Sequence, residues 1–215
     1  MRGEAPVAPV APRPLLSGVF DLPLPVRLTT VAVFGYAVGC LNAAYYVVRR
    51  RLGSDIRDHH SGNAGATNAG RVMGRRGYLA VLVLDTGKGA AAALVGLALA
   101  GATGAAVGGV ASVVGHVWPA QLGWRGGMGV ATMLGVMLLV DPLVLLAGIA
   151  IASACYGVTR RYMASGLVAM ATAPFVGALL GRPWTTIVPL TVMVAIMAFT
   201  HRGDMREAFA PRTGA

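Results

Sequence analysis

Long apolar runs alternate with short polar segments along most of the chain. The seven runs are Leu28–Val48, Tyr78–Ala100, Ala102–Trp118, Val130–Val140, Leu143–Val158, Met163–Leu180 and Thr185–Thr200. The first run has 21 residues, and as a helix it would extend about 31 Å, enough to cross the hydrocarbon core of a bilayer. The pattern therefore predicts an all-α, polytopic membrane protein with about seven transmembrane helices.

The fourth run is too short to span a bilayer by itself. Val130–Val140 has 11 residues, and a helix needs about 20 to span a bilayer. We therefore expect its helix to begin within the preceding glycine-rich segment, Gly123–Gly129; otherwise the number of spans is lower. Pro119 and the Asp141-Pro142 pair mark the ends of neighbouring runs, because proline cannot continue a helix without losing a hydrogen bond.

Composition excludes a water-soluble globule. Hydrophobic residues make up 56% of the chain and charged residues 12%, whereas soluble domains have roughly a quarter charged residues. The first 27 residues hold six of the twelve prolines and predict a flexible tail. We expect one membrane domain over residues 28–206 and a short tail over residues 207–215.

The positive charge predicts an orientation. The net charge is +10, and with the N-terminus outside, 13 of the 18 basic residues fall on the inner side and four on the outer side. Loops rich in Lys and Arg remain in the cytoplasm, so the C-terminus and the glycine-rich loops are predicted to be cytoplasmic. Because these arginines flank apolar runs, we expect a lipid bilayer as the partner and not a nucleic acid.

Neither a metal nor another cofactor is expected. Cys40 and Cys155 both lie within apolar runs, where cysteine is commonly a small core residue. Asp58, His59 and His60 are consecutive, and adjacent histidines point apart in most backbones, so they lack the spacing of a metal site.

A polar segment, Ser61–Arg71, carries groups suited to an anion. Gly62 and Gly65 permit turns that expose backbone N–H groups, and the Arg71 guanidinium is a fork that matches phosphate. Neutral polar groups come from Ser61, Asn63, Thr67 and Asn68. The alternative interpretation is a solvated glycine-rich turn.

Three further features bring polar chemistry into the apolar runs or next to them. Asp85 and Lys88 are three residues apart within a run, so they share a helix face and form either a functional pair or a structural ion pair. His116, near the end of the third run, is either a proton carrier or a helix cap. The glycines of Gly126–Gly129 offer backbone amides at a helix start, which favours anions.

Together these motifs resemble the acyl-phosphate:glycerol-3-phosphate acyltransferases of bacterial membranes. The matches are SGNxGATNxxR at Ser61–Arg71, DxxKG at Asp85–Gly89, GHxxP at Gly115–Pro119, RY at Arg161-Tyr162 and HR at His201-Arg202. The resemblance implies an enzyme of the bacterial cytoplasmic membrane that moves a fatty acyl group from acyl phosphate to glycerol 3-phosphate. The products are lysophosphatidate and phosphate, and no covalent acyl-enzyme forms.

The resemblance also implies site roles. The predicted catalytic residues are Ser61, Asn63, Asn68, Arg71 and His201. The predicted substrate-binding residues are Gly62, Gly65, Thr67, Asp85, Lys88, His116, Gly126, Gly127, Met128, Gly129, Ser165 and Asp204. No metal ligand is implied.

Several positions depart from the family pattern. Met128 stands where the family has lysine, and Asp204 stands where it has asparagine. Ala164 takes the place of a serine, with Ser165 next to it. The change from lysine to Met128 removes a positive charge and the change from asparagine to Asp204 adds a negative one, so two alternatives are an acyltransferase for an acceptor without phosphate and a catalytically silent membrane scaffold.

Overall fold

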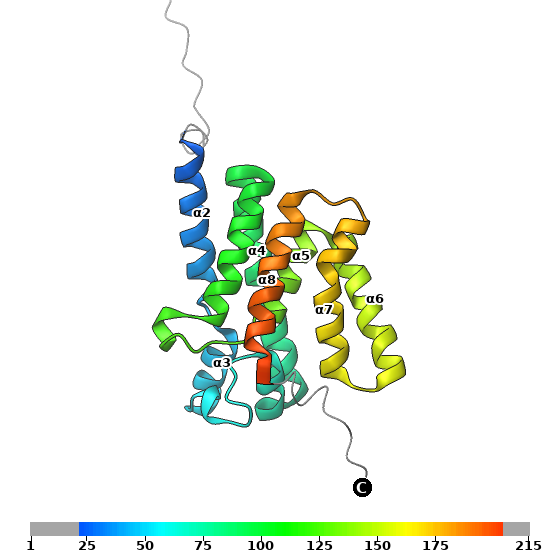
Figure 1. The fold of residues 1–215 in the computed structure, drawn as a ribbon. Helices are drawn as coiled ribbons and strands as arrows, with labels where there is room; N and C mark the ends of the chain where they lie inside the picture. Colours follow the sequence, from blue (N-terminus) through cyan, green and yellow to red (C-terminus); the bar gives the residue numbers. More distant parts are fainter. Residues whose placement is uncertain (1–21, 204–215) are drawn as a thin grey trace, which may run out of the picture.

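The structure is a computed structural model that describes residues 22–203. Its helices are α2 (Leu24–Gly39), α3 (Ala43–Leu52), α4 (Ala66–Val117), α5 (Val130–Val140), α6 (Pro142–Thr159), α7 (Tyr162–Leu179) and α8 (Trp184–Thr200), with short 3-10 turns η1 (Ile56–Asp58) and η2 (Ala120–Leu122). No strand occurs between residues 22 and 203. The predicted all-α class is confirmed (Figure 1). Asp204 and most of the two predicted tails lie outside the described residues.

Four helical stretches of the described chain are long and apolar enough to cross a membrane. They are Leu24–Leu52, Ala66–Leu122, Pro142–Thr159 and Tyr162–Leu179. The helices Val130–Val140 and Trp184–Thr200 are apolar but shorter. Helices α6, α7 and α8 begin and end within one residue of the runs predicted for them.

The first predicted span is broken in the structure. The run Leu28–Val48 is continuous in hydropathy, yet α2 ends at Gly39 and α3 begins at Ala43. The ammonium of Lys88 donates to the carbonyls of Gly39 (3.0 Å) and Leu41 (2.9 Å) at the break. The prediction of one continuous helix over Leu28–Val48 was therefore wrong. Lys88 satisfies two carbonyls that in a continuous helix would accept hydrogen bonds from the helix itself.

Helix α4 contains two predicted runs joined by a tight turn. The backbone leaves helical geometry at Gly74, Ala100 and Gly101, where both glycines have positive φ. The two halves fold back on each other so closely that a side chain at Gly96 would meet the carbonyl of Gly104. Glycine at these positions permits both the turn and the backbone contact.

Helix α5 does not extend into the glycine-rich segment as expected. It begins at Val130, directly after Gly129, whose φ of 90° belongs to the left-handed region. Its 11 residues give a length of about 17 Å. The preceding segment is instead folded against the end of α4, so it cannot supply further helical turns.

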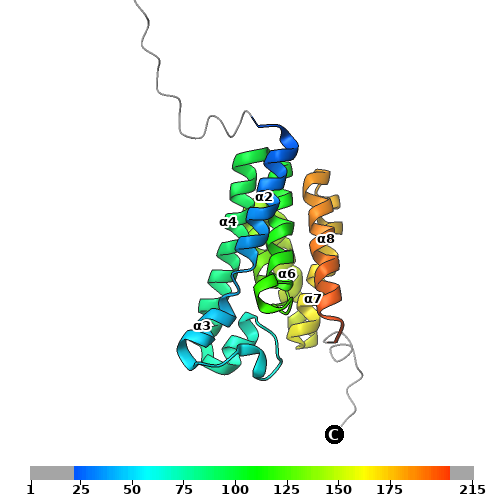
Figure 2. The same cartoon turned by 90° about the vertical axis from the view of Figure 1, so that its left-hand side faces the viewer.

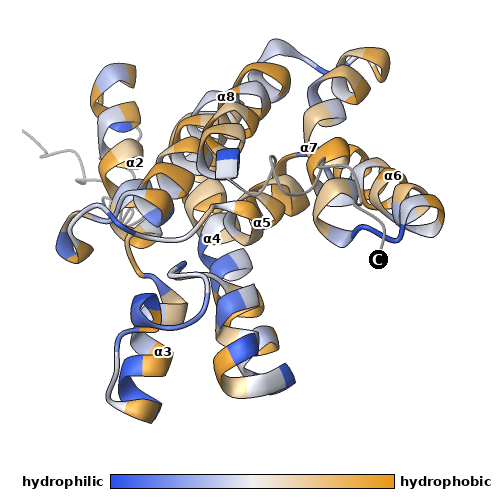
Figure 3. Cartoon of the chain, turned by 60° about the horizontal axis from the view of Figure 1, so that its bottom comes forward, coloured by the Kyte–Doolittle hydropathy of each residue, from blue (hydrophilic) through white to orange (hydrophobic). Residues whose placement is uncertain are grey.

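The polar connections gather at one end of the bundle. Residues 53–65, 119–129 and 160–161 lie with the end of α8 toward the lower end in Figures 1 and 2. The turns at residues 100–101 and 181–183 lie at the opposite end. Figure 3 shows apolar helices through the bundle and hydrophilic positions concentrated on α3 and the first turns of α4. The fold thus brings the predicted motifs to one face.

Candidate functional site

A cavity of about 600 Å³ lies among α4, α5, α6, α7 and α8, a volume typical of small-molecule sites. The polar side chains on its wall include those of Ser61, Asn63, Thr67, Arg71, Asp85, His116, Ser165 and His201. Most of the remaining wall is apolar and includes Leu134, Met137, Ile149 and Met170. Because α7 contributes residues from Tyr162 to Ala173, the cavity follows this helix for roughly 16 Å. Its shape and lining suit a molecule with a polar head and an apolar tail.

The loop before α4 is anchored by buried residues. Ile56 and Ala64 are fully buried in a cluster with Val48 and Val81. The side-chain amide of Asn68 donates to the carbonyls of residues 56, 59 and 63 at 3.0, 3.0 and 2.9 Å. Asn68 lies behind the cavity wall, so its amide organises the loop that presents Ser61 and Asn63.

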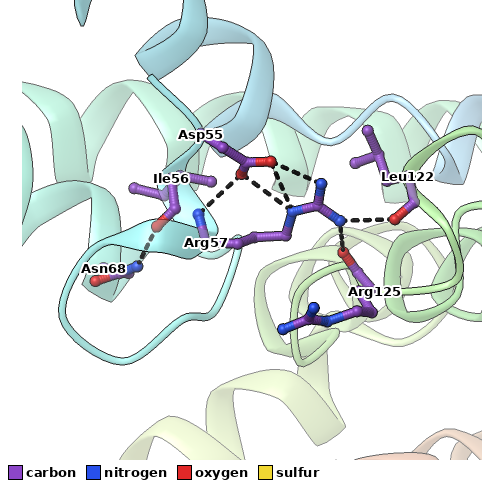
Figure 4. Close-up of polar contacts among 6 residues, drawn as sticks. All are labelled: Asp55, Ile56, Arg57, Asn68, Leu122 and Arg125. Atoms are coloured by element: carbon purple, nitrogen blue, oxygen red, sulfur yellow. Dashed lines mark hydrogen bonds and ion pairs between the residues drawn. The ribbon is translucent and has the colours of Figure 1, made fainter.

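Arg57 joins this loop to the loop after α4 (Figure 4). Its Nη1 donates to the carbonyls of Leu122 (2.6 Å) and Arg125 (3.2 Å), while Nε and Nη2 contact the carboxylate of Asp55, the latter at 2.7 Å. The Arg57 guanidinium holds the pKa of Asp55 below its usual range through this hydrogen bonding. Sequence reasoning gave Arg57 no role, because the two carbonyls that it joins to this loop lie 65 and 68 residues away.

The start of α4 is open to an anion. Its N-cap, Gly65, offers no side-chain cap, so the first backbone N–H groups of the helix lack intrahelical partners. Thr67 and Arg71 lie one turn apart on the same face and both reach the cavity wall. Within residues 22–203, the side chains of Ser61, Thr67 and Arg71 form no hydrogen bond or ion pair.

A second uncapped helix start faces the same cavity. The amides of Gly126 and Gly127 donate to carbonyls at the end of α4, at 3.0 and 3.1 Å, and these glycines are not on the wall. Met128 and Gly129 are on the wall, and α5 begins directly after them without a side-chain cap. The apolar side chain of Met128 therefore stands beside a helix start that favours negative charge.

Asp85, Lys88 and His116 form a buried polar network. The Nζ of Lys88 lies 2.9 Å from Oδ1 of Asp85 and 2.8 Å from Nδ1 of His116. The three side chains are 1 to 7% exposed. Asp85 and His116 reach the cavity, whereas Lys88 is behind it. The predicted pairing of Asp85 with Lys88 is confirmed.

His201 and Ser165 complete the polar end. Nδ1 of His201 lies 2.9 Å from the carbonyl of Met197, and a carbonyl only accepts, so Nδ1 carries the proton and Nε2 is free to accept. The Ser165 hydroxyl donates to the carbonyl of Arg161 at 2.8 Å. Both residues are buried.

The structure thus brings most of the predicted site residues to one cavity. The exceptions among the described residues are Gly62, Asn68, Lys88, Gly126 and Gly127, which are not on its wall. In the part of the chain that the structure describes, no group of three or more His, Cys, Asp or Glu side chains has the arrangement of a metal site.

These features define a membrane-embedded protein whose cavity has a polar end and an apolar body, and comparison with known proteins identifies the family. The chain belongs to the glycerol-3-phosphate acyltransferase family, whose model matches residues 29–210.

Relatives and solved structures agree with this assignment. Glycerol-3-phosphate acyltransferase 1 of Desulfitobacterium hafniense (strain Y51) is 38% identical over 80% of this chain and 86% of its own length. The corresponding enzyme of Agrobacterium fabrum is 37% identical over 86% and 90%. The crystal structure of PlsY, an integral membrane glycerol 3-phosphate acyltransferase, in its glycerol 3-phosphate form is similar with a TM-score of 0.78 and 29% identity, covering 84% of this chain and 90% of that one.

Proposed function

We propose that this protein transfers a fatty acyl group from acyl phosphate to glycerol 3-phosphate, forming lysophosphatidate for phospholipid synthesis. The observation that carries the proposal is the meeting of two uncapped helix starts, those of α4 and α5, at the polar end of one otherwise apolar cavity. The reaction brings together two phosphates and one acyl chain. Each phosphate has a helix start, and the acyl chain has the apolar body of the cavity.

The donor phosphate belongs at the start of α4. Ser61, Thr67 and Arg71 converge there with polar groups that have no partner among residues 22–203, and backbone N–H groups at a helix start favour an anion. The acyl tail extends along the apolar wall toward Met137 and Ala173, where each buried methylene contributes about 0.8 kcal/mol.

The acceptor belongs at the start of α5. Its phosphate lies against the amides around Met128 and Gly129, and Nε2 of His201 accepts a hydrogen bond from a glycerol hydroxyl. This placement follows from the proton on Nδ1 of His201, which leaves Nε2 as the free acceptor.

The chemistry needs alignment more than activation. The hydroxyl oxygen of the acceptor forms a bond to the acyl carbonyl carbon, the bond from that carbon to the phosphate oxygen breaks, and the hydroxyl proton leaves on the phosphate. An acyl phosphate already carries a good leaving group, so positioning the two substrates and stabilising the oxyanion suffice. No residue is required as a covalent nucleophile.

Similar proteins support the assignment of substrates. The two PlsY structures are a glycerol 3-phosphate form and a lysophosphatidic acid form, which for PlsY correspond to the acceptor and the product of this reaction. The present chain is an integral membrane protein of the same family, and we place its polar loops in the cytoplasm and its N-terminus outside on the distribution of arginines.

A direct assay tests the function. Purified protein receives acyl phosphate and labelled glycerol 3-phosphate, and phosphate release and labelled lysophosphatidate are measured separately. We expect the two products in equal amounts, and neither without both substrates. Phosphate release without labelled lipid would indicate a different acceptor, and an intact protein that forms neither product would favour a silent binding protein.

A further inference from the structure

His116 stands where two loops and the cavity meet. Its backbone carbonyl accepts from the amide of Gly127 (3.1 Å) and the side chain of Asn42 (3.4 Å). Its ring occupies the space that a side chain at Gly127 would fill, with Nε2 nearest to that position. The imidazole therefore lies directly against Gly127 at the cavity wall, which explains why residue 127 has no side chain.

Lys88 determines which nitrogen of His116 carries the proton. The ammonium has three N–H groups and no lone pair, and its three hydrogen bonds go to the carbonyls of Gly39 (3.0 Å) and Leu41 (2.9 Å) and to Nδ1 of His116 (2.8 Å). Nδ1 must therefore be the acceptor. The neutral imidazole then carries its proton on Nε2.

Asp85 supplies the counter-ion of this arrangement. Its Oδ1 lies 2.9 Å from the Lys88 ammonium, and the carboxylate side chain is 1% exposed. A buried ammonium needs such a partner. Lys88 thereby remains a donor and keeps Nδ1 of His116 as an acceptor.

The two histidines on the cavity wall consequently present opposite groups. His201 has its proton on Nδ1, bonded to the carbonyl of Met197, and offers a lone pair at Nε2. His116 offers an N–H at Nε2, for which the residues between 22 and 203 provide no hydrogen-bond acceptor.

We propose that His116 is a catalytic hydrogen-bond donor to the acyl carbonyl oxygen, and that Lys88 is the positioning residue that fixes its tautomer. This inference rests on the proposed function. As the acceptor oxygen attacks the carbonyl carbon, negative charge develops on the carbonyl oxygen, and Nε2–H of His116 stabilises it. His116 transfers no proton, because the hydroxyl proton leaves on the released phosphate.

A matched pair of variants distinguishes hydrogen-bond donation by the His116 side chain from its packing. In His116→Gln the side-chain NH2 takes the place of Nε2–H, whereas in His116→Asn the shorter amide reaches only the place of Nδ1. We expect kcat of His116→Gln to remain within about tenfold of wild type and kcat of His116→Asn to fall roughly 10²- to 10³-fold, the usual loss for one oxyanion donor. The KM for glycerol 3-phosphate should change little in both. His60→Asn, at a loop position outside the cavity wall, is the control.

Nitrogen NMR of histidine-labelled protein reads the tautomer without any turnover. The His116 signals should show a proton on Nε2 in wild type, assigned by their absence in His116→Gln, and a mixture of tautomers in Lys88→Met. Equal kcat in His116→Gln and His116→Asn, or a wild-type proton on Nδ1, would overturn the proposal. Wild-type protein without acyl transfer would instead overturn the proposed function, and the NMR result would still report the tautomer.

Discussion

Arg71 is the one Arg or Lys side chain on the cavity wall within residues 22–203. We expect Arg71→Ala to lose acyl transfer while remaining folded and membrane-inserted, because the donor phosphate loses its charged partner. A hydrogen bond to a charged group contributes about 1.5–3 kcal/mol, so kcat/KM for acyl phosphate should fall at least ten- to a hundredfold. Initial rates measure this, with Arg75→Ala, an exposed position off the wall, as the control. Wild-type rates in Arg71→Ala would remove the residue from the site.

Met128 places an uncharged side chain beside the start of α5. If the acceptor phosphate lies there, Met128→Lys should lower the KM for glycerol 3-phosphate with a smaller effect on kcat, because the added ammonium stabilises bound acceptor. Met128→Gln, which adds polarity without charge, is the matched control. An unchanged KM in Met128→Lys would show that this position does not face the acceptor phosphate. Loss of the natural reaction with no use of glycerol 3-phosphate would indicate an acceptor without phosphate.

At the scale of elements, Arg57 holds the loop before α4 against the loop before α5 (Figure 4). These loops carry the two helix starts, so Arg57→Gln should reduce kcat while leaving the apolar binding of the acyl tail intact. Arg57→Lys should retain part of the activity, because an ammonium can still reach one carbonyl but not the fork-shaped set of partners. Steady-state kinetics of both variants, with acyl-chain binding measured separately, check this. Equal activity in Arg57→Gln and wild type would contradict it.

The ion pair between Asp55 and Arg57 makes the stability of the folded protein depend on pH. Because the pKa of Asp55 is lowered in the folded protein, the pair stabilises the fold above the unfolded-state pKa, about 3.9, and this contribution is lost as pH falls through the folded value. Thermal unfolding in detergent should show Asp55→Asn less stable than wild type at pH 7. The difference should shrink below about pH 4. If the stability difference between Asp55→Asn and wild type persisted unchanged in acid, it would arise from packing and not from the charge of Asp55.

The sequence pattern predicts those elements whose signals are local. Hydropathy and flanking Gly, Pro and Arg residues place α6, α7 and α8 within one residue, and the motifs from Ser61 to His201 indicate most of the polar wall. The break after Gly39 escapes such a pattern because Lys88, 49 residues away, satisfies its carbonyls. The sequence also cannot distinguish a supporting role of Asn68 or Gly127 from a direct contact with substrate. That distinction depends on how loops distant in sequence meet in the fold.

At the scale of the whole molecule, the gathering of polar loops at one end requires that this end face the substrates. We expect it to face the cytoplasm. A cysteine at His60, in the loop before α4, should be protected from an impermeant thiol reagent in intact cells, and one at Trp184, which is 67% exposed at the opposite end, should react. Labelling followed by mass spectrometry measures both. The reverse pattern would invert the orientation and contradict the distribution of arginines.

The apolar body of the cavity also has a kinetic consequence. In the proposed reaction the acyl tail keeps the same wall from Met137 to Ala173 before and after the transfer, since only its head group changes. Lysophosphatidate and the donor therefore compete for one tail site, and the product should act as an inhibitor that raises the apparent KM for acyl phosphate without lowering the maximal rate. Lysophosphatidate that accumulates in the membrane would then slow its own production, so the rate of its synthesis depends on how quickly a later reaction removes it.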